Sequence, residues 1–297
     1  MTRCILRIVD ALGCRIFGPM FVGGHNVEEV LKEGARLKQE GYKVTYNLLG
    51  EHLNDRVLVD YALSTTVSLI EKINSENKGN VAIKPTLYGL QISRDVFYKN
   101  ANRIIGHAKD AGISVEFDAE QRRFLEDSLW VFNAFASRLE YGGFVRQCMQ
   151  AHLKDIFDLG DKYGLWDKQI RVVKGAGVYE EKDGVCFKSP VNILRQYFEI
   201  IRRNKSRGKY PFVATVRDKK LTEEIIKDYS NPLDVEFEIL YGPLGTRLGK
   251  HLLHRGYSVR IYVPFVDAWC EDAWKEYGLR RSAMMRRLLW EEIKGKK

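Results

Sequence analysis

The feature that most constrains the fold of this chain is an alternation between short β-rich runs and longer segments of helical periodicity. Eight β-rich runs follow one another, at 43–51, 80–85, 113–120, 144–153, 170–177, 210–218, 235–242 and 258–265. The segments between them place apolar residues at three- and four-residue steps, as in 57–76 and 189–206. This order is typical of βα units that form a parallel sheet.

The 297 residues contain no linker and no low-complexity segment, so one domain over 1–297 is predicted. Eight βα units in one domain favour a (β/α)8 barrel of the TIM type, an α/β fold, preceded by amino-terminal helices within 1–40. A doubly wound open sheet is the alternative. It has less support, because the glycines at 175 and 177 lack the third glycine of a dinucleotide-binding turn and no acidic residue ends the next strand.

Composition excludes several classes of protein. The chain has 48 Lys and Arg against 39 Asp and Glu, a net charge of +9, but the charge is dispersed and no nucleic-acid motif accompanies it. Nucleic acid is therefore not expected as a partner. Five cysteines without CxxC spacing argue against a disulfide or zinc framework, and no metal set is expected.

No run approaches the roughly 20 apolar residues that span a bilayer. Cysteine usage and the absence of a transit-like leader predict a cytoplasmic protein. The segment 1–24 resembles an amphipathic helix, and its apolar face leaves open a peripheral contact with the inner face of a membrane.

Polar residues stand toward the carboxyl ends of the β-rich runs, where the active sites of (β/α)8 barrels lie. Charged residues inside apolar runs are costly unless they are paired or bind a ligand, so these side chains are expected to converge. The set consists of Glu51, Lys84, Asp118, Glu120, Gln150, Arg171, Lys174, Thr215, Glu238 and Tyr262. Its cations suit phosphate or carboxylate groups. A layer of mutually paired polar residues would explain the same pattern without a ligand.

A final helix is predicted over 274–295. Tyr277, Arg280 and Arg281 lie at i, i+3 and i+4 in it and therefore share one face. A basic amphipathic helix with a solvated side would show the same spacing.

The strand-end segments, in their order, resemble those of the proline dehydrogenase family. The motifs that carry this resemblance are YNLLGE, VAIKPT, EFDAE, MQAHL, RVVKGAG, EFEILYG, VRIYVPF and EDAWKEYGLRR. They cover nearly the whole chain. The resemblance implies a distorted (β/α)8 barrel that uses FAD to oxidise L-proline to Δ1-pyrroline-5-carboxylate. Hydride would pass to flavin N5, as the first step of proline catabolism, and a quinone or another acceptor would take the electrons.

The resemblance also implies roles at the substrate. Arg280 and Arg281 on the final helix, together with Lys84, are expected to clamp the proline carboxylate, which suits the bidentate geometry of guanidinium groups. Glu51 is expected to pair with Arg280 as a gate over the site.

Two aromatic residues are expected to wall the pyrrolidine ring, namely Tyr262 and Tyr277. Asp118 is expected to orient Tyr262 by a hydrogen bond. On the cofactor side, the resemblance implies that FAD contacts Gln150, Arg171, Val173, Lys174, Gly175, Ala176, Thr215 and Glu238.

The chain departs from the family pattern at several positions on the flavin side. Gly177 stands where an aromatic residue is expected, Val216 where a histidine is expected, and Glu238 where a glutamine is expected. Two further hypotheses therefore stay open. One is a related flavoenzyme that oxidises another cyclic imino acid, such as hydroxyproline or a biosynthetic intermediate. The other is a non-catalytic barrel that binds an anionic ligand.

Overall fold

A computed structural model describes the chain apart from residues 1–17, 176–178, 215–218, 271–272, 274–276 and 278–297. Eight parallel strands pair in sequence order and close into a barrel, with β1 hydrogen-bonded to β8. The strands are β1 (Lys43–Leu48), β2 (Asn80–Ile83), β3 (Val115–Phe117), β4 (Val145–Gln150), β5 (Ile170–Val173), β6 (Phe212–Val213), β7 (Glu236–Leu240) and β8 (Ser258–Phe265). The predicted (β/α)8 barrel is confirmed, and the open sheet is excluded.

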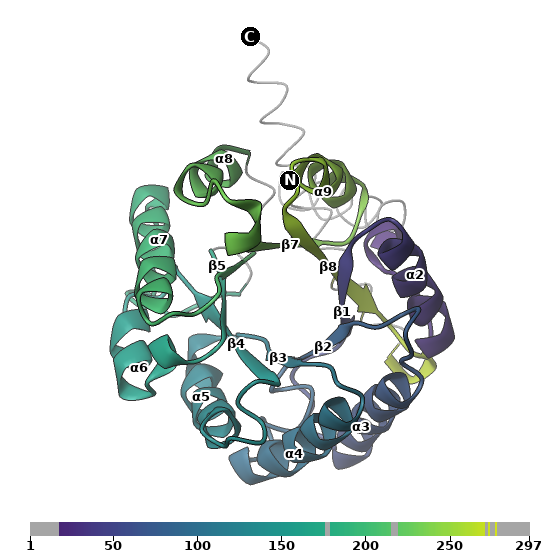
Figure 1. The fold of residues 1–297 in the computed structure, drawn as a ribbon. Coiled ribbons are helices and arrows are strands. Elements are labelled where there is room, and N and C mark those ends of the chain that lie inside the picture. The colour runs from purple at the N-terminus through teal and green to yellow at the C-terminus, as the bar shows by residue number, and fades with distance from the viewer. Residues whose placement is uncertain (1–17, 176–178, 215–218, 271–272, 274–276, 278–297) are drawn as a thin grey trace, which may run out of the picture.

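Helices surround the barrel on its outside, as Figure 1 shows in a view down the barrel. They are α2 (Val27–Gln39), α3 (Arg56–Glu71), α4 (Arg94–Asp110), α5 (Arg122–Ala136), α6 (Ile156–Lys162), α7 (Pro190–Ser206), α8 (Lys219–Asp228) and α9 (Pro243–His254). Short 3-10 helices are η1 (Gly18–Phe21), η2 (Leu165–Asp167), η3 (Pro232–Asp234) and η4 (Ala268–Cys270). The helices predicted over 57–76 and 189–206 are confirmed as α3 and α7, although α3 ends earlier.

Local sequence explains where several of these helices begin. The side chain of Asn26 accepts a hydrogen bond from the Glu29 amide at the start of α2, and Ser93 does the same for Val96 at the start of α4. Such caps satisfy amide groups that have no partner within a helix. No helix in the part of the chain that the structure describes is long and apolar enough to cross a membrane.

The hydrophobic core fills the space between strands and helices. Within this core, α2 packs against β1 at Gly34, where a Cβ atom would lie 1.8 Å from the Tyr46 hydroxyl oxygen. Tyr46 is fully buried, and its hydroxyl donates to the carbonyl oxygen of Asn77 at 2.6 Å. The absence of a side chain at Gly34 therefore lets α2 approach the barrel closely enough to cover it.

Most strands are shorter than the β-rich runs that predict them. The run 113–120 contains strand only at β3, and the run 144–153 contains strand only at β4. The difference lies mainly at the carboxyl ends, because the chain leaves the sheet there and enters loops. Some of the predicted site residues lie on these loops and others lie on the strands themselves.

Candidate active site

One arginine organises the interior of the barrel toward its carboxyl end. Arg171, from β5, is buried, and its Nη1 donates to Glu116 Oε2 at 2.9 Å and to Glu238 Oε2 at 3.0 Å. Its Nη2 donates to Asp118 Oδ1. Burial opposes the charge of Arg171, but Glu238 and the other carboxylates outweigh burial and raise the pKa well above its ordinary range. A permanently charged cation is thus fixed among three carboxylates from β7, β3 and the end of β3.

Tyr262 also belongs to this network and comes from β8, which pairs with β7. Its hydroxyl donates to Asp118 Oδ2, and the guanidinium carbon of Arg171 lies 5.3 Å from the centre of its ring. Burial, together with Asp118, raises the pKa of Tyr262 well above its ordinary value. The tyrosine therefore stays protonated and holds a fixed orientation. Its contact with a substrate stays a prediction.

A further layer of buried charge lies below this network. Glu116 Oε1 accepts from Arg146 at 2.9 Å, while Glu236 accepts from Arg260 at 2.6 Å and, at the rim of the layer, from the exposed Lys43 at 2.6 Å. Burial raises the pKa of Glu236, but Arg260 and the other cations outweigh it and hold that pKa at about 2. The sequence interpretation missed these pairs. The signal was present, because charged residues recur two positions apart at Glu116 and Asp118 in and just after β3 and at Glu236 and Glu238 in β7, the spacing of side chains that share one face of a strand.

Several buried polar atoms have no hydrogen-bond partner in the described part of the chain, and three of them belong to predicted site residues on β4, β5 and β7. These three are Gln150 Oε1 at the end of β4, Arg171 Nε on β5 and Glu238 Oε1 on β7. Buried polar atoms are nearly always satisfied in folded proteins, by protein or by a bound molecule. These atoms could therefore hold a polar ligand at this end of the barrel.

Glu238 combines this unsatisfied oxygen with an unusual protonation state. Burial raises its pKa to about 7, although Arg171 pulls in the opposite direction. The residue is a carboxylic acid where the family pattern has a glutamine, and near neutral pH it carries a proton part of the time.

The segment that follows β5 passes very close to the end of β4. Gly175 has φ of +79°, and a Cβ atom there would lie 2.0 Å from His152 Nδ1. Only glycine fits this position. Burial lowers the pKa of His152, while the carbonyl oxygen of Lys174 at 3.2 Å opposes that shift. Val173 pairs with Gln150 across the two strands, so the predicted cofactor residues of β4 and β5 are neighbours.

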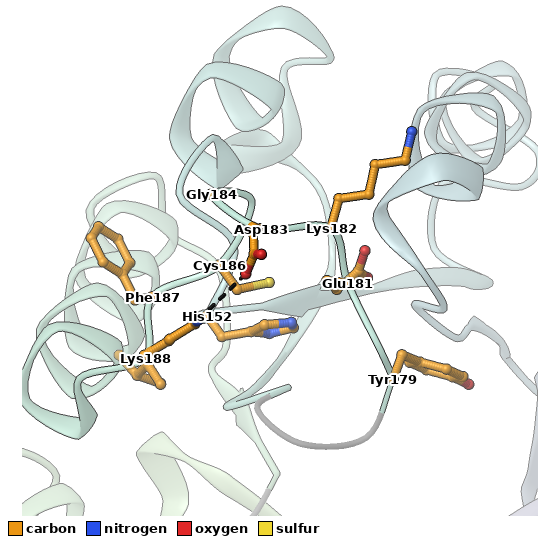
Figure 2. A pocket seen from close by; sticks show the side chains of 10 residues that line it. His152, Tyr179, Glu181, Lys182, Asp183, Gly184, Cys186, Phe187 and Lys188 are labelled. Atoms are coloured by element: carbon orange, nitrogen blue, oxygen red, sulfur yellow. Dashed lines mark hydrogen bonds and ion pairs between the residues drawn. The ribbon is translucent and has the colours of Figure 1, made fainter.

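A cavity of about 350 Å³ opens beside His152. Figure 2 shows His152 and Cys186 within it, with Tyr179 at its edge and the Tyr179 ring turned away from both. The cavity is lined mainly by the segment that joins β5 to α7, so it adjoins the segment predicted to approach FAD.

Of the remaining predicted residues, some belong to the part of the chain that the structure describes and the others do not. Lys84 Nζ donates to Asn47 Oδ1 at 2.9 Å, and Glu51 Oε2 accepts from Tyr179 at 3.3 Å. Tyr277 is buried. The residues predicted for site contacts that lie outside the described part are Ala176, Thr215, Arg280 and Arg281.

The sequence interpretation missed Tyr179, which contacts Glu51, and Thr86, which contacts the His52 amide and Glu120. Tyr179 lies beyond the end of β5, and Thr86 lies beyond the end of β2, so neither interrupts an apolar run. A strand-end pattern cannot detect such loop residues, since loop geometry is not encoded in hydrophobic periodicity.

Comparison with known proteins agrees with the geometry. The model of the family described as proline dehydrogenase matches residues 30–281. Proline dehydrogenase 2 of Bacillus subtilis (strain 168) is 29% identical over 265 residues, which cover 86% of this chain and 84% of that protein. The proline dehydrogenase of Deinococcus radiodurans is 28% identical over 260 residues, which cover 84% of this chain and 81% of that protein.

Among solved structures, proline utilization A (PutA) from Bdellovibrio bacteriovorus superposes with a TM-score of 0.73 at 19% identity. The match covers 89% of this chain and 32% of the PutA chain, so this protein spans about a third of that length. This likeness establishes the shared fold. The family match covers well over half of the sequence, and the chain therefore belongs to the proline dehydrogenase family.

Proposed function

We propose that this protein is an FAD-dependent proline dehydrogenase, which oxidises L-proline to Δ1-pyrroline-5-carboxylate as the first step of proline catabolism. Beyond family membership, one observation carries the proposal. The buried Arg171 network leaves Gln150, Arg171 and Glu238 each with an unsatisfied polar atom toward the mouth of the barrel. A polar, planar ligand such as the flavin ring would supply the missing partners.

The residues of this region fit FAD. Gln150 and Arg171 would contact the flavin ring, and the bare backbone at Gly175 would permit close approach, because no side chain fits there. The full set proposed to hold the cofactor is Gln150, Arg171, Val173, Lys174, Gly175, Ala176, Thr215 and Glu238. When bound, the flavin accepts hydride from the substrate at N5.

The chain's own residues bind and orient the substrate. Lys84 with Arg280 and Arg281 would hold the proline carboxylate by charge-assisted hydrogen bonds. Tyr262 and Tyr277 would wall the pyrrolidine ring. The hydrogen bond from Tyr262 to Asp118 fixes the tyrosine ring before substrate arrives, so no free energy of binding is used to order it.

Glu51 would close the site. It follows β1, whereas Tyr179 follows β5, and these two strands lie opposite one another in the closed barrel. The 3.3 Å hydrogen bond between the two side chains therefore crosses the mouth. With Arg280 as an added partner, Glu51 would help exclude water during hydride transfer.

A quinone or another acceptor would reoxidise the flavin, in a cytoplasmic protein with a peripheral position at the inner face of a membrane.

A second candidate is oxidation of a different cyclic imino acid. The observation that favours it is Glu238, a carboxyl group where the family pattern has a glutamine. A panel of imino acids with an artificial electron acceptor separates the two candidates. A proline dehydrogenase requires the highest kcat/KM with L-proline, whereas the second candidate requires it with another imino acid.

Arg280→Met tests the carboxylate clamp. Loss of a charge-assisted hydrogen bond is expected to raise the KM for L-proline about tenfold or more. Arg202→Met, which removes an exposed arginine from α7, serves as the control and should leave KM unchanged. An unaltered KM in Arg280→Met would exclude that residue from the clamp.

A further inference from the structure

The loop that follows β1 has an unusual backbone. Gly50 has φ of +138°, and His52 has φ of +61°. His52 is the one residue other than glycine with positive φ in the described part of the chain. This conformation is costly for a side chain with a Cβ atom and persists only where the surroundings enforce it. Glu51 lies between these two residues, so its direction depends on whatever holds the loop.

A short relay of hydrogen bonds holds it. The His52 amide donates to Thr86 Oγ1 at 2.8 Å, and the Leu53 amide donates to the Thr86 carbonyl oxygen at 3.2 Å. Thr86 in turn donates its own amide to Glu120 Oε2 at 2.8 Å and its hydroxyl to Glu120 Oε1 at 2.6 Å. Both Thr86 and Glu120 are buried.

The direction of these bonds is fixed by the number of protons. A threonine hydroxyl has one proton, and here Glu120 accepts it. A lone pair of Thr86 Oγ1 is thereby left to accept from the His52 amide. An ionised Glu120, which only accepts, thus stabilises the conformation of His52, and with it the placement of Glu51 next to Tyr179.

We propose that Glu120 is a positioning residue, whose carboxylate holds Glu51 across the barrel mouth through the Thr86 hydroxyl and the His52 backbone amide. The consequence for proline binding rests on the proposed function. The claim that Glu120 holds the loop at His52 does not rest on the proposed function, because it concerns only the hydrogen bonds of the relay.

The proposal implies a dependence on pH. Burial raises the pKa of Glu120 to about 7, Thr86 and Lys84 oppose this shift, and Glu51 adds to it. Lys84 at the end of β2 and Glu51 on the loop are thus the charged groups that act on Glu120, and the imidazole of His52 belongs to the same loop. A protonated Oε1 would donate to Thr86 Oγ1, so both lone pairs of that oxygen would accept and the buried threonine proton would lose its acceptor, which makes this arrangement less stable. The hold should therefore weaken as pH falls through about 7.

Hydrogen exchange tests the hold directly. In FAD-loaded protein near pH 8, Thr86→Val should raise the exchange rate of the His52 amide about fivefold or more, the factor expected for one net hydrogen bond. Thr86→Ser keeps a hydroxyl and should retain most of the protection. Thr66→Val is the matched control, since it also removes a buried hydroxyl, one that contacts Tyr88 at 2.7 Å outside the relay. Equal exchange at His52 in Thr86→Val and Thr66→Val would overturn the proposal.

Kinetics test the consequence at the site. Glu120→Gln and Thr86→Val are expected to raise the KM for L-proline about fivefold, with a smaller effect on kcat. The wild-type KM should fall between about pH 6 and about pH 8, and Glu120→Gln should diminish that change more than Glu238→Gln does, which removes the other carboxyl group with a pKa near 7. A Glu120→Gln enzyme that keeps the wild-type pH profile refutes the positioning role. If the wild-type protein does not oxidise L-proline, the proposed function fails, and the exchange experiment still decides whether Glu120 holds the loop.

Discussion

Replacing Glu238 by glutamine removes a buried ionisable group and leaves the shape of the side chain nearly unchanged. Glu238 is 4% exposed, with one oxygen on Arg171 and the other without a partner in the described part of the chain. Glutamine keeps an oxygen that accepts from Arg171. The substitution therefore isolates the effect of the carboxyl proton on stability.

The expected magnitude follows from the pKa of Glu238. Burial raises it from 4.5 to about 7, so the folded protein binds the proton more tightly than the unfolded chain does. The contribution to stability is complete below pH 4.5 and is lost as pH rises through about 7. At about 1.4 kcal/mol per pH unit, the loss amounts to about 3 kcal/mol. Glu238→Gln should lack this loss.

Denaturant unfolding at about pH 5, 6, 7 and 8 measures the effect. The free energy of unfolding of Glu238→Gln minus that of wild type should increase by about 3 kcal/mol between the lowest and the highest pH, because only wild type is destabilised as pH rises. Glu224→Gln removes an exposed carboxylate from α8 and should run parallel to wild type. Parallel curves for Glu238→Gln and wild type would refute the raised pKa.

Two other substitutions test the packing and the network. Gly34→Ala would place a Cβ atom 1.8 Å from the Tyr46 hydroxyl and should lower the free energy of unfolding by about 3 kcal/mol, whereas Gly106→Ala, in open space on α4, should raise it by about 0.5 kcal/mol. A similar effect of both alanines on the midpoint of thermal unfolding would contradict the close approach of α2. Tyr262→Phe removes the hydrogen bond to Asp118 and should cost about 2 kcal/mol in urea unfolding, and an unchanged midpoint would rule out that bond.

The order of elements in the barrel was accessible from the sequence. Hydrophobic runs mark each strand, and all eight pair in sequence order in the closed sheet. The convergence of Asp118, Arg171, Glu238 and Tyr262 was likewise predicted from strand-end positions, and the structure joins all four in one network. Strand direction and the two-residue period suffice for that inference.

Other features were not accessible, for physical reasons. The ends of the strands were predicted too late, because the predicted runs were carried on through 118–120 after β3 and 151–153 after β4, where the chain has already left the sheet. The contact between Glu51 and Tyr179 depends on the path of two loops. The relay from Glu120 to His52 depends on a positive φ at a residue that is not glycine, which no local pattern indicates.

The most direct test of the central claim is the visible absorbance of the purified protein, loaded with FAD and held without oxygen, before and after L-proline is added. The proposed function predicts a flavin spectrum that loses its absorbance as L-proline reduces the cofactor, and no change with an amino acid that lacks the ring, such as L-alanine. A protein that takes up no FAD, or whose flavin spectrum persists at saturating L-proline, would contradict the claim.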